Sequence, residues 1–388
     1  MNPTVSFVVP CYKLAHLLGE CVESILGQTY RDFEVLIMDD CSPDNTAEVA
    51  QSFTDPRVRH VRNEPNLGHL RNYNKGIELA RGKYVWLISA DDRLRRPYVL
   101  ERYVRLLDEY PKIGYVFCPG VRLRSGQELD VLDYSVHGDH DAIFDGRQFF
   151  AQLVKANTIV AASTLVRRTC YETVSKFPLD MPWAGDWYLW CVFALKFDVG
   201  YLAEPMVCYR EHELSMTTTL MNRDAGICSS EDVAMPWVMR QKVEEAGYSH
   251  LIKDCLAAAA VEYARSIASQ RYRQANSSMS LEQFEESLCS NTSVKREREW
   301  IRARVYARMA DLFYGQGQLS LARKFYWSSI RREPWRLKVW TKWLLLRLGS
   351  VGRCLRACLG ERRSGDSRST PTQVEATTPI REAQIVSE

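Results

Sequence analysis

Several features are missing from this chain of 388 residues, and each absence narrows its class. No apolar run approaches the roughly 18 uninterrupted residues that span a bilayer, so we expect no transmembrane helix. The N-terminus has no charged region followed by an apolar one, so we expect no signal peptide. The 12 cysteines include no CxxC pair and no zinc-type Cys/His spacing. This indicates reduced thiols in the cytosol rather than a disulfide framework or a zinc site.

Acidic residues are scarce toward the C-terminal end. The formal net charge is +3, but residues 295–363 contain 18 Lys and Arg against 5 Asp and Glu, a local net of +13. The rest of the chain therefore sums to −10. Two interpretations of the basic end stay open: a set of solvated helix faces, or a surface that meets an anionic partner.

Apolar, β-rich runs alternate with segments of helical spacing in the first third of the chain. Strands are predicted at 5–9, 33–38, 57–61 and 83–88, and helices at 14–26, 70–80 and 97–110. This alternation is typical of βαβ units in an α/β fold with a doubly wound, mostly parallel, Rossmann-like sheet. The segment 125–145, rich in Gly, Asp and His, is expected to be a loop.

The composition predicts three parts along the chain. We expect an α/β domain at 1–220, an α-helical extension at 221–360 and a disordered tail at 361–388. Within the helical part, the spacing between Tyr306 and Pro334 matches one tetratricopeptide-like helix pair, and a basic, Trp-rich end follows. The tail is rich in Ser, Thr and Pro and almost without aromatic residues.

Two aspartate pairs each close a predicted buried strand. Asp39 and Asp40 follow the strand 33–38, and Asp91 and Asp92 follow the strand 83–88. Ligands bind outside the carboxyl ends of parallel strands, so both pairs should face one cleft. Such acids suit a divalent cation and a phosphorylated substrate, because the cation relieves carboxylate repulsion and neutralises phosphate oxygens. Helix or turn capping is the alternative for either pair alone.

Several blocks in their order and spacing resemble the start of the family 2 glycosyltransferases of GT-A fold. The resemblance covers about residues 3–215, and its blocks are 5–13, 24–30, 33–44, 66–68, 70–72, 76–77, 82–84 and 91–92. It implies a GT-A type sheet followed by a helical extension that lies outside the family pattern.

The resemblance implies a nucleotide-sugar site. Asp40 would accept a hydrogen bond from the base, with Asp39 beside it, since a fixed acceptor selects a base that carries an imide N–H. Arg71 would lie near the base or the phosphates, for which its planar fork of donors is suited. A surface helix position is the alternative for Arg71. The nucleotide-sugar residues implied in all are Pro10, Tyr12, Asp39, Asp40, Gly68, Arg71, Asn72 and Asp91.

The resemblance also implies a metal ion. Asp92 matches the metal-contacting aspartate of the family, and Asp91 would contact the ribose or support the metal. Position 90 is Ala, so the sequence departs from a literal Asp-x-Asp, and which acid touches the metal stays open. Oxygen ligands at a diphosphate favour Mn²⁺ or Mg²⁺. His212 is a further candidate metal or phosphate contact, with a structural histidine as the alternative.

Asp186 resembles the general base of the inverting members. A sugar hydroxyl is a poor nucleophile, and a positioned carboxylate that accepts its proton contributes roughly 10²- to 10⁴-fold. The same residue could serve as a helix N-cap. Trp183, Trp187 and Trp190 could offer flat faces to a sugar ring, although their helical spacing makes at least one a core residue.

The sequence therefore predicts an inverting, metal-dependent glycosyltransferase that moves a sugar, from a UDP-sugar first of all, to a hydroxyl of a glycan or lipid-linked glycan. Two alternatives stay open. A catalytically silent GT-A scaffold would bind glycan or partners, and a nucleotidyltransferase would also use a doubly wound sheet with metal-binding acids. The latter would need a Gly-rich phosphate loop after the first strand, which the segment 9–12 lacks.

A cytoplasmic location is expected. Residues 335–363, with their tryptophans and basic side chains, predict a peripheral contact with the inner face of the cell membrane. We expect no nucleic-acid partner, because no aromatic-basic binding motif is recognisable.

Overall fold

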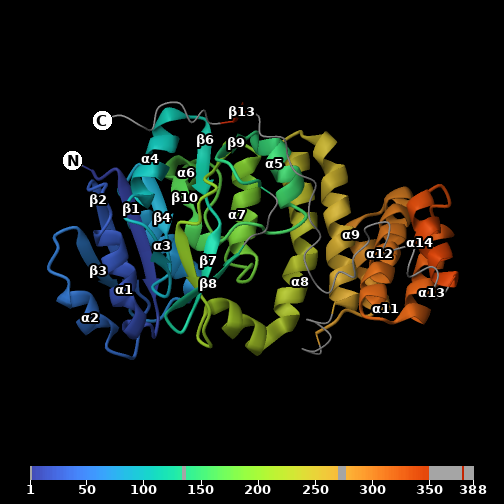
Figure 1. Cartoon of the computed structure of the whole chain (residues 1–388), viewed down its shortest axis with the longest axis horizontal. Helices are drawn as coiled ribbons and strands as arrows, with labels where there is room; N and C mark the ends of the chain where they lie inside the picture. The colour runs from blue at the N-terminus through green and yellow to red at the C-terminus, as the bar shows by residue number, and fades with distance from the viewer. Residues whose placement is uncertain (1, 133–136, 270–276, 349–377, 380–388) are drawn as a thin grey trace. The chain divides into compact units, whose positions relative to one another are not determined.

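The structure is a computed structural model that describes residues 2–132, 137–269, 277–348 and 378–379. The chain divides into two compact units (Figure 1). The first comprises residues 1–153, 157–219 and 370–388, and the second comprises 154–156 and 220–369. Of the predicted disordered tail, only Thr378 and Pro379 are described, as a short strand; the rest of that prediction lies outside the described residues.

The first unit contains a nine-stranded sheet in the order β13-β9-β11-β6-β10-β4-β1-β2-β3. Its strands are β1 (Val5–Cys11), β2 (Phe33–Asp39), β3 (Val58–Arg62), β4 (Tyr84–Leu87), β6 (Ile113–Phe117), β9 (Ala142–Phe144), β10 (Leu165–Arg167), β11 (Asp198–Tyr201) and β13 (Thr378–Pro379). Strands β4, β1, β2 and β3 form a parallel block, and β11 is parallel to β6. Strand β10 runs antiparallel between β4 and β6. The predicted α/β fold with a large, parallel-rich sheet is confirmed.

A smaller sheet lies in the same unit in the order β5-β12-β7-β8. Its strands are β5 (Arg93–Leu94), β7 (Gly120–Arg124), β8 (Gln127–Leu132) and β12 (Val207–Arg210). Strands β7 and β8 form a hairpin whose turn residues, Ser125 and Gly126, both have positive φ (50° and 77°). Such a turn matches the twist of the flanking strands. The loop predicted at 125–145 is therefore wrong in part: it contains β8 and β9.

Helices cover both faces of the large sheet. They are α1 (Ala15–Leu26), α2 (Thr46–Ser52), α3 (His69–Leu79), α4 (Val99–Glu109), α5 (Gly146–Leu153), α6 (Arg168–Thr173) and α7 (Gly185–Ala194), with a 3₁₀ turn η1 at Ala161–Ser163. Phe7 of β1 packs with residues of α1 and α4, whereas Val8 points to α3. A Cβ at Gly76 of α3 would lie 2.3 Å from Val8 Cγ1, so only glycine permits this close approach.

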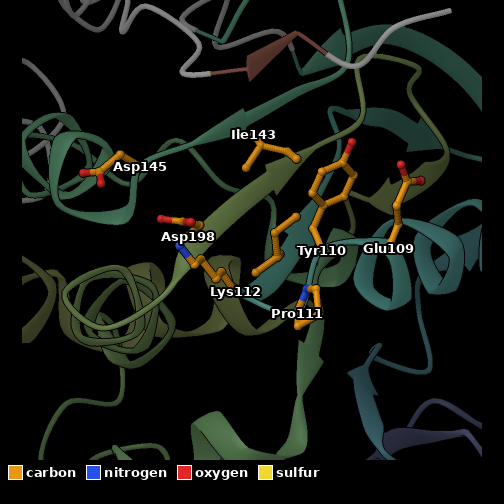
Figure 2. A pocket seen from close by; sticks show the side chains of 8 residues that line it. Glu109, Tyr110, Pro111, Lys112, Ile143, Asp145 and Asp198 are labelled. Carbon is orange, nitrogen blue, oxygen red and sulfur yellow. The ribbon is translucent and has the colours of Figure 1, made fainter.

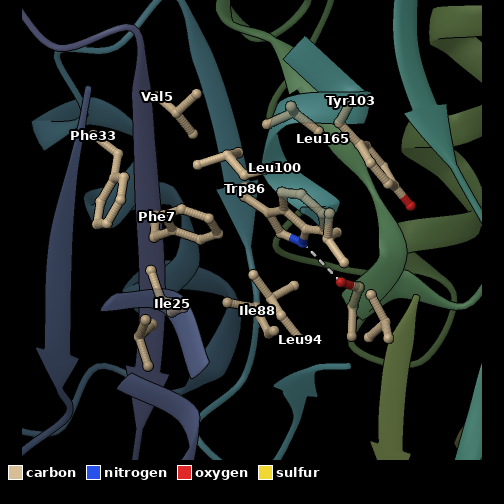
Figure 3. Packing of buried hydrophobic residues seen from close by; sticks show 14 of the residues in the cluster. Val5, Phe7, Ile25, Phe33, Trp86, Ile88, Leu94, Leu100, Tyr103 and Leu165 are labelled. Atoms are coloured by element: carbon tan, nitrogen blue, oxygen red, sulfur yellow. Dashed lines mark hydrogen bonds between the residues drawn. The ribbon is translucent and has the colours of Figure 1, made fainter. Parts of the chain in front are cut away.

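Stacked aromatic rings form the centre of the core between the sheet, α1 and α4 (Figure 3). The Phe7 and Trp86 rings stack at 5.5 Å, and Trp86 contacts Tyr103 at 4.6 Å. The buried Trp86 indole N–H donates to the Ala162 carbonyl oxygen at 2.8 Å. Burial of these large rings with the polar atom satisfied fixes the strands whose ends carry the acids.

The second unit is helical, as predicted for the C-terminal part. From Met216 onward the helices are α8 (Met216–Glu245), α9 (Ile252–Ala268), α11 (Leu281–Asn291), α12 (Lys295–Gly315), α13 (Leu319–Ile330) and α14 (Leu337–Arg347), with a 3₁₀ turn η2 at Ser249–Leu251. Its core includes the ring pairs Tyr263–Phe284 at 4.9 Å and Phe313–Phe325 at 5.5 Å. Helices α12 and α13 fall in the segment for which a tetratricopeptide-like pair is predicted. The three-part division stays a prediction.

Within the described part of the chain, we find no helix long and apolar enough to cross a membrane.

Candidate active site

The ends of β1, β2 and β4 meet at one edge of the large sheet. The Asp40 backbone N–H donates to the Cys11 carbonyl oxygen at 3.0 Å, and the Ala90 N–H donates to the Pro10 carbonyl oxygen at 3.1 Å. Both turns that carry aspartates are thus tied to the end of β1. Because β1 lies between β2 and β4, the two pairs of acids are separated by about two strand spacings, or roughly 10 Å.

The backbone is strained where β1 and β2 end. Lys13 (φ 60°) and Cys41 (φ 59°) have positive φ although neither is glycine. Their turns are linked, because the Lys13 N–H donates to Ser42 Oγ at 3.2 Å. Such conformations cost of order 1–3 kcal/mol each and cluster at ligand sites. Here they shape the edge next to Pro10, which is buried in β1, and Tyr12, which is 44% exposed.

Asp39 is fully buried and its carboxylate is used by the protein. Oδ2 accepts from the Arg62 guanidinium at 2.6 Å and pairs with His60 Nε2 at 3.3 Å. Oδ1 accepts from the Ser42 N–H at 2.8 Å. These bonds hold the turn after β2 against β3, so Asp39 supports the site rather than facing a ligand.

Asp40 is also buried, and its carboxylate binds the segment that connects β3 to α3. Oδ1 accepts from the Asn63 side-chain amide at 2.9 Å and from the Leu67 N–H at 2.8 Å. Oδ2 accepts from the Gly68 N–H at 2.9 Å. Gly68 has φ 79°, which side chains rarely adopt. Oδ2 accepts only this one protein bond among the described residues, so it keeps capacity for a ligand donor.

Asn63 and Asn72 complete this buried network. The Asn63 side-chain amide donates to Asn72 Oδ1 at 2.8 Å as well as to Asp40, and the Asn72 amide donates to the Met38 carbonyl oxygen at 2.9 Å. Asn72 therefore anchors α3 to the end of β2. By contrast Arg71, one residue earlier, is exposed. The predicted nucleotide residues thus separate into buried supports, the exposed Gly68, whose N–H holds Asp40, and two exposed side chains, Tyr12 and Arg71.

Asp91 and Asp92 lie in the turn after β4, where β12 fastens them. The Arg210 N–H donates to Asp92 Oδ1 at 2.8 Å, and the Arg210 guanidinium donates to the Asp91 carbonyl oxygen at 2.7 Å. His212 Nε2 lies 2.9 Å from Asp91 Oδ2. Burial raises the pKa of the Asp92 carboxyl well above its usual range, and the adjacent Asp91 charge raises it further.

The other carboxylate oxygen of Asp91, Oδ1, differs from Oδ2 in its hydrogen bonding. Among the residues that the structure describes, the buried Asp91 Oδ1 has no hydrogen-bond partner. A buried carboxylate oxygen without a donor is costly unless something binds it. Across all the residues that the structure describes, no group of three or more His, Cys, Asp and Glu side chains could hold a metal ion. A carboxylate pair with a free oxygen fits Mg²⁺ or Mn²⁺, which bind through one or two carboxylates plus phosphates and water.

Asp186 lies in the first turn of α7, and contacts with α3 fix this end of the helix. The segment before α7 is tied to α3 because the Asn74 side chain exchanges hydrogen bonds with the Phe177 backbone at 2.8 and 2.9 Å. His69 Nε2 lies 3.1 Å from the Pro182 carbonyl oxygen. Asp186 Oδ2 accepts from the Asn157 side-chain amide at 3.1 Å. Trp187 and Trp190 are buried, so these two are core residues.

Tyr73 of α3 connects the acids electrostatically. Burial raises the pKa of its hydroxyl, and the negative charges of Asp91, Asp186 and Asp92 raise it further. The charges of these three carboxylates, which are far apart in the sequence, thus all act on one hydroxyl group. One turn earlier, burial lowers the pKa of His69, and the Asp40 charge opposes that shift. Hydrogen bonds thus tie α3 to the Asp40 network and to the segment before α7, which carries Asp186 in its first turn.

Sequence reasoning missed Tyr73, Asn63 and Arg210 as site residues. Asn63 comes directly after β3 at the same strand-end edge, a position that could have suggested a role. Tyr73 looks like an ordinary aromatic residue of a helix, and its ring does pack on His69 and Phe177 at 5.6 and 5.4 Å.

A pocket elsewhere in the unit contains none of the predicted site residues (Figure 2). It lies where β6 and β11 begin, at the sheet edge opposite to the aspartate pairs, and its lining includes Tyr110, Lys112, Asp145 and Asp198. The acid-lined edge and not this pocket is therefore the candidate active site.

Comparison with known proteins shows what the stretch that carries most of this site is similar to. The model of Glycosyl transferase family 2 matches residues 6–172. Residues 6–172, less than half of the chain, are therefore similar to this family. The match includes Asp40, Asp91 and Asp92, whereas Asp186 and His212 lie beyond it.

The relatives match this chain over short stretches. An uncharacterized protein of Mycobacterium tuberculosis is 38% identical over 118 residues, 30% of this chain and 36% of that protein. The glycosyltransferase GlyG of Streptococcus pneumoniae is 35% identical over 111 residues, 28% of this chain and 37% of that protein. The matched stretches thus span little more than a third of these relatives.

The whole chain resembles a solved structure. Residues 1–349 of TarS from S. aureus, in complex with UDP-GlcNAc, superpose with a TM-score of 0.58 at 15% identity, covering 90% of this chain and 92% of that chain. At this identity the likeness concerns the fold. The predicted GT-A type sheet with C-terminal helices is confirmed at that level.

Proposed function

We propose that the protein is an inverting, metal-dependent glycosyltransferase that uses a nucleotide-sugar, a UDP-sugar first of all, and a hydroxyl of a glycan or lipid-linked glycan acceptor. The observation that carries the proposal is the pair of aspartate turns tied to the end of β1, with Asp40 held by the Asn63 network and Asp91 Oδ1 buried without a partner among the described residues. The family 2 match supports it. The UDP-GlcNAc and UDP complexes of TarS support a uridine nucleotide.

The nucleotide would lie along the ends of β1 and β2. Asp40 Oδ2 would accept from the base, while Asn63 and Gly68 keep the carboxylate in place. The exposed Tyr12 ring would form one wall of the base site, and the exposed Arg71 guanidinium would reach the diphosphate.

The diphosphate and a metal ion would lie at the turn after β4. Asp91, through its unpartnered Oδ1, and Asp92 would hold the ion, and His212 would orient Asp91 through their hydrogen bond. A bound Mn²⁺ or Mg²⁺ supplies charge neutralisation for the leaving diphosphate. Asp92 would hold the ion as a carboxylate, the form in which oxygen ligands bind such cations.

Asp186 would act as the base. Its carboxylate accepts the proton of the acceptor hydroxyl while that oxygen bonds to the anomeric carbon. The bond between this carbon and the diphosphate oxygen breaks, and its electron pair leaves with the nucleoside diphosphate. Attack opposite to the leaving group inverts the configuration. Asn157, which donates to Asp186 Oδ2, would orient the carboxylate.

A panel of nucleotide-sugars tests the proposal. Purified protein with Mn²⁺ should hydrolyse or transfer at least one sugar, and Asp92→Ala should abolish this turnover with the fold intact. The matched control is Asp139→Ala, an exposed acid of the same unit outside the site. If the wild-type protein binds a nucleotide-sugar but turns over none in the panel, the silent-scaffold alternative holds instead.

A further inference from the structure

The second unit carries a basic, aromatic surface on α13 and α14. Between Leu319 and Leu348 the chain has eight Lys and Arg residues and one acid, Glu333. Glu333 is only 6% exposed. Three of the eight cations are paired with acids, as Arg332–Glu299, Arg336–Glu333 and Lys342–Asp311. The other five are exposed and have no ion pair among the described residues: Arg323, Lys324, Arg331, Lys338 and Arg347.

Helix α14 and the residue after it, Leu348, present apolar side chains to solvent along one line. Leu337, Leu344 and Leu348 are 75%, 51% and 55% exposed. Their spacing of seven and four residues places them on one side of the helix, opposite to the buried Val339 and Leu346. A row of large exposed apolar side chains indicates an interaction site on a protein surface.

Cations flank this leucine line on both sides. At about 100° per residue, Lys338 lies to one side of Leu337 and Arg347 lies to the other side of Leu348. The Arg347 guanidinium also lies 4.9 Å from the centre of the Trp343 ring. An apolar centre with basic flanks is the pattern of helices that lie in a membrane interface.

Tryptophans extend the surface beyond the leucine line. The rings of Trp327, Trp340 and Trp343 contact one another at 5.3 to 6.0 Å, and they join α13 to α14. Trp327 is 43% exposed, and Trp335, just before α14, is 70% exposed. Indole rings favour the headgroup level of a bilayer, where one edge is apolar and the other is wet.

We propose that this surface, made of exposed residues of α13 and α14 together with Trp335, binds an anionic lipid bilayer. The leucine line enters the boundary between headgroups and acyl chains, and the five unpaired cations meet the anionic headgroups. A second copy of the chain fits poorly, because the contact would set these cations against their own kind. Nucleic acid would match the charge but would bury the leucines against phosphates. The inference refines the predicted contact at 335–363 and does not depend on the enzymatic proposal.

Vesicle co-sedimentation of the full chain tests the proposal. We expect binding to vesicles of phosphatidylcholine with phosphatidylserine, little binding to phosphatidylcholine alone, and weaker binding as NaCl rises. The triple variant Leu337→Ser, Leu344→Ser, Leu348→Ser and, separately, the double variant Lys338→Glu, Arg347→Glu should each lower the partition coefficient at least about tenfold.

Matched controls separate this surface from general effects. Leu179→Ser replaces an equally exposed leucine of the first unit, and Arg59→Glu with Lys253→Glu makes the same change of charge at exposed sites elsewhere. Both should bind like the wild type. All changed side chains are exposed, so circular dichroism and thermal melts should match as well.

Three results would overturn the proposal. One is equal binding of the wild type and of the leucine variant to anionic vesicles. Another is binding of the wild type to a single-stranded oligonucleotide together with no capture by anionic vesicles. The third is a wild-type dimer in sedimentation equilibrium that the leucine variant converts to monomer, together with no vesicle binding.

Discussion

Replacing Asp186 with Asn separates a catalytic base from a helix-capping residue. Asn keeps the size of the side chain but cannot accept a proton. If Asp186 takes the proton of the acceptor, kcat should fall by about 10²- to 10⁴-fold, which corresponds to about 3 to 5 kcal/mol of activation free energy. The affinity for the nucleotide-sugar should stay the same, because the part of the site proposed to bind the nucleobase is formed by the ends of β1 and β2.

The structure bounds the cost in folding stability. Asp186 Oδ2 accepts from Asn157 and Oδ1 accepts from the Trp187 N–H at 2.6 Å. Asn can keep one of these bonds, so about 1 kcal/mol is lost with the other. Loss of a negative charge in the first turn of α7 costs about 0.3–1 kcal/mol more. The free energy of unfolding should therefore fall by only about 1 to 2 kcal/mol, combining these two losses.

The assay combines initial rates with binding and melting. Turnover is measured with saturating nucleotide-sugar and Mn²⁺, nucleotide binding by calorimetry, and stability by urea unfolding. Glu282→Gln, in the first turn of α11, is the matched control because it removes a helix N-terminal charge far from the acids in the sequence. If Asp186→Asn loses about 1 to 2 kcal/mol of stability but keeps its kcat, Asp186 is a helix-capping residue and not the catalytic base.

Three further predictions concern stability. Burial lowers the pKa of His137 to about 4 from an ordinary value near 6.5, so the unfolded chain takes up this proton more readily and the free energy of unfolding falls as the pH falls. Between pH 7 and 5 this loss is about 2 kcal/mol. In His137→Phe, urea unfolding should show a free energy of unfolding that falls by about 2 kcal/mol less over the same range. An unchanged slope would contradict this. Asn63→Ala removes an amide that satisfies two buried oxygens, so it should cost about 1–3 kcal/mol and weaken UDP binding in calorimetry; undiminished UDP affinity would exclude its positioning role. Gly76→Ala should lower Tm because a Cβ collides with Val8, whereas Gly19→Ala in α1, with nothing within 4 Å, should raise it; equal shifts would contradict the packing argument.

Much of the fold follows from local patterns. The helix expected at 14–26 is α1 at Ala15–Leu26, and the strand expected at 33–38 is β2 at Phe33–Asp39. Buried apolar runs and helical spacing are strong signals because the whole element has to match the core. The hairpin of β7 and β8 was missed because β8 is almost entirely exposed, so no buried face imposes a pattern on it.

The site was predictable where chemistry stands out in the sequence. Acid pairs after apolar strands are unusual enough to mark the edge of the sheet before any coordinates. The supports were not, because Asn63 and Tyr73 act only through their place beside α3. The sequence also could not divide the two acid pairs by role. Asp39 is bound by Arg62, whereas a buried oxygen of Asp91 has no partner in the described part of the chain.

Anomalous diffraction from crystals grown with UDP and Mn²⁺ would test the central claim most directly. The account predicts a manganese peak beside Asp91 Oδ1 and Asp92, with the diphosphate on the ion and the uracil next to Asp40. A UDP molecule bound without manganese in the pocket around Tyr110 and Asp198, with the turn after β4 empty, would contradict it.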